Sequence, residues 1–191
     1  MLPFIIGEAD SIPKEYRQYQ SLIDACDVEK EQHGRVGYLT VMETDVSPAR
    51  SQRRPGLHVE RHPGNRWGAG SGWGKGSYAD RRQGGLYMAS NIAESTAVWN
   101  EAVTEPGAGG DCEHLRNTLG DADKVLAANE LLWMTDSCVH ESRPLEEQAH
   151  RQFFRLVTSE VDLWFAQHST ANNLGVKPPE RVQIITENKF S

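Results

Sequence analysis

Two metal-binding side chains are separated by a single residue in His58-Val59-Glu60, and a second histidine, His140, lies far downstream. Residues i and i+2 of a β-strand point to the same face, so a strand here would present an imidazole and a carboxylate side by side. A lone buried histidine is more often a hydrogen-bonded core residue. Two imidazoles and one carboxylate on one side of a metal, however, suit non-haem Fe(II) and leave coordination positions open. His58, Glu60 and His140 are therefore the predicted catalytic metal ligands.

Arginines follow the second histidine at a spacing that suits a bound carboxylate. Arg151 comes eleven positions after His140, and Arg155 four positions later. A planar guanidinium matches a carboxylate with two parallel hydrogen bonds. Because residues i and i+4 of a strand share a face, both arginines are expected to point inward.

The ordered set, His-x-acid, then His, ten residues and Arg, resembles the Fe(II)/2-oxoglutarate-dependent dioxygenases over about residues 40–158. The resemblance implies a double-stranded β-helix, a jelly-roll or cupin-like barrel, with Fe(II) on His58, Glu60 and His140. It also implies 2-oxoglutarate as co-substrate, chelating the iron through its 2-oxo acid end. Its other carboxylate would be anchored by Arg151, with Arg155 as the alternative.

Two positions depart from the family pattern. Glu60 stands where Asp is commoner, and Phe153 occupies the place of the usual small hydroxyl residue two positions after the arginine. Near His140, Asp136 is an alternative carboxylate ligand or a residue that orients the imidazole, although a loop-capping role is favoured over both. Cys138 is an alternative ligand for zinc, although a small buried cysteine needs no such role.

The segment 64–85 is rich in glycine, with Trp67 and Trp73 among the glycines. This composition predicts a long, mobile loop without packed structure, which would serve as a lid over the substrate. Trp67, Trp73 and Arg54 are the predicted substrate contacts. Arg54 belongs to a basic cluster just before His58 that would steer an anionic small molecule toward the metal.

Hydrophobic periodicity and turn residues predict one N-terminal helix followed by about eight short strands. The helix is expected at 13–31. Strands are expected at 36–46, 57–60, 85–93, 95–99, 125–134 (one strand or two), 153–165 and 182–186. Between them we expect a short helix or irregular segment at 111–119, irregular chain at 135–144 and a helical turn at 145–150. With little strand–helix alternation, a mainly antiparallel barrel or sandwich is favoured over a doubly wound parallel sheet.

These elements predict a single domain over 1–191, made of an N-terminal helical segment (1–35), a β-barrel core (36–165) and a C-terminal extension (166–191). The formal net charge is -7, which argues against binding to nucleic acid or to an anionic membrane surface. Three cysteines without a CxxC pair, and the lack of a recognisable signal peptide or long apolar run, predict a cytoplasmic protein. Apolar edge strands would permit a homodimer.

Two other functions fit the same residues. A cupin-type metalloprotein that does not use 2-oxoglutarate would share the barrel and the metal but not the role of the arginine. A non-enzymatic jelly roll would use its histidines structurally and its glycine- and aromatic-rich loop for contact with a carbohydrate or a protein. The segment 72–77 only partly resembles a phosphate-binding loop, because Ala69 and Gly76 occupy positions that this motif reserves for other residues.

Overall fold

The structure is a computed structural model that describes residues 1–62, 71–72, 76–78 and 82–187. Within these residues the chain is mainly β, with largely antiparallel sheets that do not close into a barrel. No helix among them combines the length and the apolar character needed to cross a bilayer.

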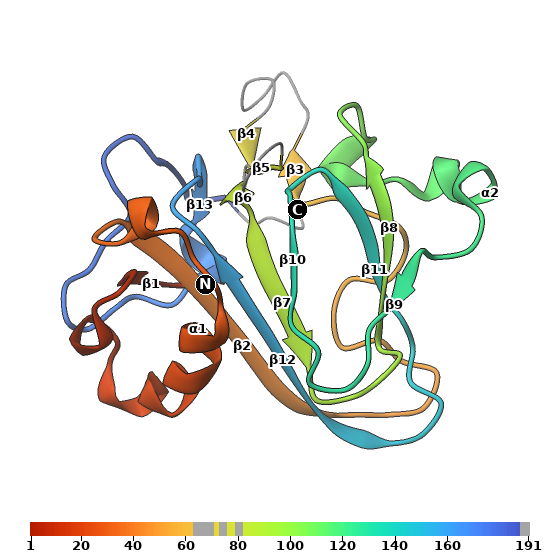
Figure 1. The fold of residues 1–191 in the computed structure, drawn as a ribbon, viewed down its shortest axis with the longest axis horizontal. Coiled ribbons are helices and arrows are strands. Elements are labelled where there is room, and N and C mark those ends of the chain that lie inside the picture. The colour runs from red at the N-terminus through yellow and green to blue at the C-terminus, as the bar shows by residue number, and fades with distance from the viewer. Residues whose placement is uncertain (63–70, 73–75, 79–81, 188–191) are drawn as a thin grey trace.

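The larger sheet has five antiparallel strands in the order β1-β2-β12-β7-β10 (Figure 1). Its strands are β1 Leu2–Ile5, β2 Val36–Val46, β12 Ala149–Val157, β7 Leu86–Ser90 and β10 Leu132–Met134. The long strands β2 and β12 pair from Ala149 opposite Val46 to Val157 opposite Tyr38. This extended ladder is the backbone of the sheet.

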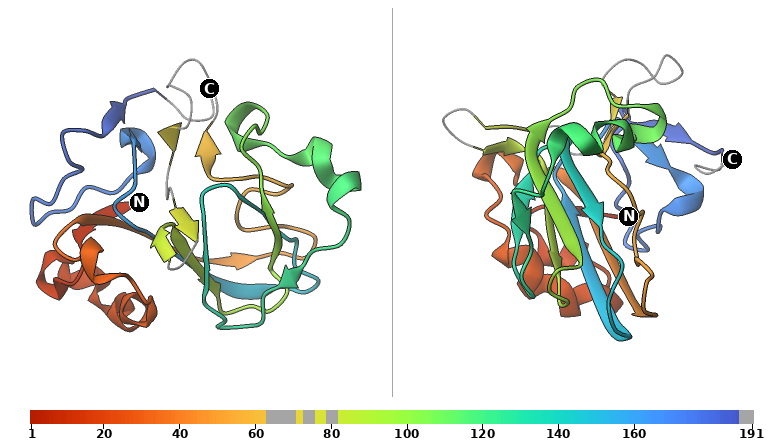
Figure 2. Two further views of the ribbon diagram at one scale, coloured as in Figure 1. Left: turned by 45° about the horizontal axis from the view of Figure 1, so that its top comes forward. Right: turned by 90° about the vertical axis from the view of Figure 1, so that its right-hand side faces the viewer.

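The smaller sheet has three antiparallel strands in the order β11-β8-β9. They are β11 Cys138–Ser142, β8 Thr96–Ala102 and β9 Lys124–Val125. His58 forms isolated antiparallel bridges to His140 of β11 and to Asp111, so the segment 57–60 follows the outer edge of β11. The two sheets stand opposite each other, and the N-terminal helices cover the outer face of the larger one (Figures 1 and 2).

Successive side chains of β12 point alternately to the pocket between the two sheets and to the outer face of the larger sheet. Phe154 and Leu156 pack with the N-terminal segment, including Phe4. Arg151, Phe153 and Arg155 take the alternate positions and line a pocket between the sheets. Because successive side chains of a strand point to opposite faces, one strand supplies both the core and the pocket.

The N-terminal segment is only partly the helix that the sequence predicts. A 3₁₀ helix at Lys14–Tyr19 leads into the short α1 Gln20–Ala25, and another 3₁₀ helix spans Lys30–Gln32. The hydroxyl of Tyr87 donates a hydrogen bond to the carbonyl of Asp27, between the two helical parts. This tertiary contact holds the intervening chain out of the helix. Residues 1–35 also contribute strand β1, which the prediction missed.

The prediction of irregular chain at 135–144 and a helical turn at 145–150 is wrong. Residues 138–142 form β11, and β12 begins at Ala149. The alternate residues His140 and Ser142 of β11 face the pocket, whereas Val139 enters a core with Leu57 and Trp99. A strand whose inner face is polar lacks the apolar periodicity on which the prediction relied.

Most other predicted strands are found with shifted boundaries, but the strand predicted at 57–60 is wrong, because only His58 forms isolated bridges there. The expected strand at 36–46 matches β2, and the run 125–134 contains the two strands β9 and β10. The expected strand at 153–165 is two elements, because β12 ends at Val157 and the chain resumes as β13 Leu163–Phe165. The last strand, β14 Gln183–Ile185, pairs in parallel with β13.

Short elements complete the described chain. The further 3₁₀ helices span Ala9–Ser11, Ala108–Gly110, Glu113–Leu115 and Ala166–His168, and the helix α2 spans Arg116–Leu119. Within the predicted glycine-rich loop lie β4 Ser71–Gly72, paired with β3 Arg61–His62, and β5 Gly76–Tyr78, paired with β6 Arg82–Gly84. The expectation of no regular structure there is wrong for these residues, and Trp67 and Trp73 lie outside the described residues.

Gly110 fixes the path of the segment that carries His58 and Glu60. Its carbonyl accepts a hydrogen bond from the backbone N–H of Val59 at 2.9 Å. Its φ is +81°, and a Cβ there would collide with the carbonyl oxygens of Val59 and Arg61. Only glycine therefore allows the two backbones to pass this closely.

Gly110→Ala is expected to lower the free energy of unfolding by more than about 2 kcal/mol, because a left-handed conformation and a backbone collision add together. The neighbouring Gly109 is a matched control, since its φ is +62° and a Cβ there would meet no atom within 4 Å. Gly109→Ala should cost only about 1 kcal/mol. Urea denaturation measures both values, and equal losses would contradict this account of Gly110.

Candidate functional site

His58 and His140 are cross-strand neighbours. The backbone N–H of each donates a hydrogen bond to the carbonyl of the other, both at 3.0 Å. Directly opposed residues of an antiparallel pair place their side chains on the same face, and the two imidazole centroids lie 4.4 Å apart. The meeting of two histidines separated by 82 positions in the sequence is thus a result of strand register.

Both imidazoles are held in the same tautomer. Nδ1 of His58 lies 2.8 Å from the carbonyl oxygen of Gly56, and Nδ1 of His140 lies 3.0 Å from that of Cys138. A carbonyl oxygen accepts only, so each Nδ1 carries the hydrogen and each neutral ring keeps its lone pair on Nε2. This is the usual way in which backbone groups orient metal-binding histidines.

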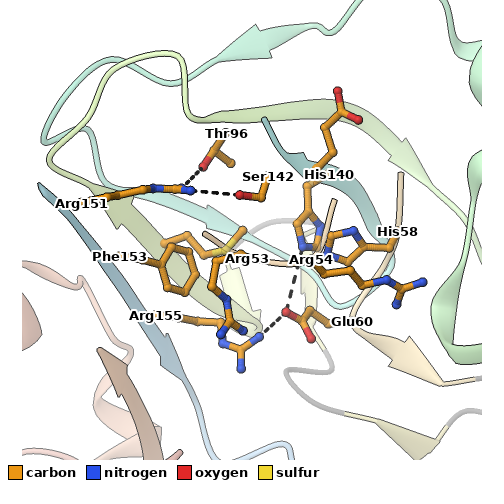
Figure 3. Close-up of a pocket in the computed structure, with 12 residues that line it drawn as sticks. Arg53, Arg54, His58, Glu60, Thr96, His140, Ser142, Arg151, Phe153 and Arg155 are labelled. Atoms are coloured by element: carbon orange, nitrogen blue, oxygen red, sulfur yellow. Dashed lines mark hydrogen bonds and ion pairs between the residues drawn. The ribbon is translucent and has the colours of Figure 1, made fainter. Parts of the chain in front are cut away.

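Glu60 brings a carboxylate to the same place. Its Oε1 lies 4.0 Å from Nε2 of His140, and the same oxygen is ion-paired with Nη1 of Arg155. The side chains of Glu60 and Arg155 are 12% and 4% exposed, so the pair is largely shielded from water. Figure 3 shows the carboxylate between the two histidines and the arginine.

The donor atoms do not yet form a closed metal site. In the described part of the chain no three His, Cys, Asp or Glu side chains are close enough to be grouped as a metal centre. Adjacent ligands at ordinary bond lengths lie about 3 Å apart, whereas the Glu60 oxygen is 4.0 Å from His140 Nε2. A metal here would require the Glu60 carboxylate to move away from Arg155 toward the histidines, and a set of two nitrogens and one carboxylate oxygen suits Fe(II).

Arg151 lies at the other end of the pocket and is completely buried (Figure 3). Its guanidinium donates hydrogen bonds to the hydroxyls of Ser90, Ser142 and Thr96 and to the carbonyl of Ser95. No carboxylate of the described residues forms an ion pair with it. Arg151 is therefore a buried cation held in position by neutral groups.

A third guanidinium, that of Arg53, lies 5.0 Å from the ring centroid of Phe153. Burial, followed by the charge of Arg155, lowers the pKa of Arg53 to about 10, while Glu60 opposes the shift. Burial alone lowers the pKa of Arg151 to about 10. Both groups remain charged at neutral pH, so the described part of the pocket gathers the guanidiniums of Arg53, Arg151 and Arg155, and the carboxylate of Glu60 lies beside Arg155.

The other charged residues around the pocket have partners elsewhere. Glu141 is ion-paired with Arg116 at 2.7 Å, and Arg54 lies 3.6 Å from Asp111 and donates to the carbonyl of Gly109. Glu141 therefore does not offset the positive charge of the pocket interior, and the charge of Arg54 is balanced by Asp111. The interior is suited to an anion, as the basic cluster before His58 predicts.

Several predicted residues are brought together and others are not. His58, Glu60, His140, Arg54, Arg151 and Arg155 all line one pocket, together with Arg53, Met88, Thr96, Ser142 and Phe153. Asp136 does not line this pocket, and the Cys138 thiol donates to the carbonyl of Trp99, with a pKa raised to about 11 by burial. Neither alternative ligand is thus placed with the histidines.

Sequence reasoning missed Thr96 and Ser142, which bind Arg151. Thr96 begins the strand β8, and Ser142 ends β11 two residues after His140. The i, i+2 spacing of His140 and Ser142 was a usable signal, but only once β11 was known to be a strand.

Comparison of the chain with protein-family models, with curated proteins and with solved structures found no match.

Burial gives the pocket a dependence on pH. Burial, reinforced by the charge of His140, lowers the pKa of His58 to about 3. Burial also lowers the pKa of His140, although Glu60 opposes this. Both rings are therefore neutral near pH 7, which is the state that binds a metal.

The unfolded chain should take up protons on these histidines below about pH 6.5, whereas the folded chain resists until near pH 3 for His58. The free energy of unfolding should accordingly decrease as the pH is lowered through this interval, by up to about 1.4 kcal/mol per pH unit for each ring. His58→Asn, which keeps a donor toward Gly56, is expected to flatten the decline. Denaturation between pH 7 and 5 measures the slope, with His150→Asn at an exposed site as control. An unchanged slope in His58→Asn would refute the assignment.

Proposed function

We propose that this protein is a non-haem iron oxygenase that couples decarboxylation of 2-oxoglutarate to the oxidation of a small, anionic molecule. One arrangement carries the proposal. A pair of imidazoles with a carboxylate lies at one end of a pocket, and a buried arginine without a carboxylate partner among the described residues lies at the other. Such a pocket suits a ligand that reaches a metal at one end and presents a carboxylate at the other.

The strand order supports a jelly-roll fold for this pocket. Apart from the short strands β3 to β6, eight segments come in this chain order: β2, residues 57–60, β7, β8, β9, β10, β11 and β12. Numbered in this order, the larger sheet reads 1-8-3-6 beyond β1, and the smaller sheet reads 2-7-4-5 when His58 is included. This interleaving is the order of an eight-stranded double-stranded β-helix, which we propose as the fold.

In the proposed site, His58 and His140 would bind Fe(II) through Nε2, and Glu60 would bind it through a carboxylate oxygen. Iron held by these residues supplies the activation of oxygen and the oxidation of the substrate. The protein orients the rings through the carbonyls of Gly56 and Cys138. It also surrounds the metal with buried side chains, which limits the access of water.

Arg151 would anchor the distal carboxylate of 2-oxoglutarate. Burying a guanidinium without a counterion is costly, and a ligand carboxylate would supply the missing charge. Four bonds to protein atoms leave one N–H of the guanidinium for a ligand. The hydroxyls of Thr96 and Ser142 accept from Arg151 and can donate their own hydrogens to the same carboxylate. These hydroxyls would replace the one that the family pattern expects at Phe153.

The proposal is tested by titrating the metal-free protein with Fe(II) and 2-oxoglutarate without oxygen, and by recording the weak visible charge-transfer band of the chelate. The wild-type protein should develop the band with one iron per chain. His140→Ala should lose stoichiometric iron. Arg151→Lys should still bind iron, but its affinity for 2-oxoglutarate should fall by at least about tenfold, because a lysine cannot reproduce the hydrogen bonds of the guanidinium.

Arg181→Lys is the matched control, since Arg181 does not line the pocket and pairs with Asp162 at its own site. It should behave as wild type. Metal binding without any response to 2-oxoglutarate would instead indicate a cupin-type metalloprotein of another chemistry. A wild-type protein that binds no iron would refute the metal site altogether.

A further inference from the structure

Arg155 already binds a carboxylate, and that carboxylate belongs to a proposed metal ligand. Its Nη1 contacts Oε1 of Glu60, and the same oxygen lies 4.0 Å from Nε2 of His140. The metal and the arginine would therefore draw on one oxygen. In a largely dry pocket, the negative charge of one carboxylate cannot fully compensate two cations.

Arg151 does not share this competition. Its side chain is fixed by the hydroxyls of Ser90, Thr96 and Ser142 and by the carbonyl of Ser95, none of which is a proposed metal ligand. The two arginines of β12 thus differ in kind. Arg151 is hydrogen-bonded to neutral groups, whereas Arg155 forms an ion pair with a carboxylate that a metal would attract.

The surroundings of Arg155 make the loss of Glu60 consequential. Burial, and after it the charge of Arg155, lowers the pKa of Arg53, as expected for two like charges that line one pocket. Glu60 offsets this repulsion while it remains beside them. A metal that draws Glu60 toward the histidines would remove this carboxylate from Nη1 of Arg155 and from the neighbourhood of Arg53.

We propose that Glu60 masks Arg155 as an anion-binding residue, and that metal binding unmasks it to receive a carboxylate of the ligand. The inference rests on the proposed function, because that function supplies the metal. Glu60 then acts as a switch between two cations, with Arg155 in the metal-free state and with the metal in the loaded state. Metal and anion are bound cooperatively, and by linkage each raises the affinity for the other by the same factor.

Removing the charge of Glu60 should unmask Arg155 without any metal. The probe is succinate, a dicarboxylate without the 2-oxo group, titrated calorimetrically into protein freed of metal by a chelator. Glu60→Gln keeps the shape and an acceptor oxygen at this position but not the charge. It should bind succinate about tenfold more tightly than the wild-type protein does, a typical size for such coupling.

The gain must depend on Arg155. The double variant Glu60→Gln/Arg155→Met should lose it, and thermal unfolding of each variant verifies that it is folded. Arg181→Met, which removes a positive charge outside the pocket, should bind succinate as the wild-type protein does. Equal affinity of Glu60→Gln and the wild-type protein, or a gain that survives in the double variant, would overturn the masking.

Titration with Mn²⁺ separates this inference from the proposed function. Arg155→Met should bind Mn²⁺ about fivefold more tightly than the wild-type protein, because the competitor for Glu60 is gone. A merely supporting Arg155 would give weaker binding in the variant, which would contradict the switch. A wild-type protein that binds no Mn²⁺ would overturn the proposed function, whereas bound Mn²⁺ without the Glu60→Gln gain for succinate would overturn the masking alone.

Discussion

The pairing of two backbone segments, at His58 and His140, is the interaction on which the site depends. Their reciprocal hydrogen bonds set the register of the 57–60 segment against β11, and this register alone brings the imidazoles together. A slip of the 57–60 segment by one residue would turn His58 to the opposite face, toward the apolar core that Leu57 now occupies, while β8 would keep His140 in place. Gly110 supports this pairing from the other side of the 57–60 segment, because the absence of a Cβ lets the backbone of Val59 pass close to the backbone of Gly110.

Charge is the second constraint. Arg151 and Arg155 reach the interior because they alternate with apolar residues on β12, and Arg53 joins them over the ring of Phe153. Burial of several guanidiniums with a single carboxylate is unfavourable for the empty pocket and favourable for an anionic ligand. The polar groups that hold Arg151 reduce this cost and fix the position of the cation.

The two constraints meet at Glu60. This residue lies two positions after His58, so strand geometry directs it to the histidines, yet Arg155 attracts the same carboxylate from the opposite sheet. Its oxygen is in direct contact with Arg155 and lies 4.0 Å from Nε2 of His140, so the attraction of the arginine prevails in this structure. We infer that the site is organised for two states rather than one, with the carboxylate of Glu60 as the movable part.

The sequence by itself determined the spacing rules. His58 and Glu60 share a face because they are two residues apart in an extended chain, and Arg151 and Arg155 do so because they are four apart in a strand. Strand β2 was predictable from its β-prone residues, since local pattern and tertiary role agree there.

Only the tertiary structure decided which faces meet. β11 was not predictable because its inner residues, including His140, are polar. They face a pocket that strands distant in the sequence form together. The attraction between Arg155 and Glu60 was likewise invisible, because 95 positions separate them and only sheet packing sets their distance. Long-range register and charge pairing arise from the folded arrangement of the strands, and a local pattern carries no record of either.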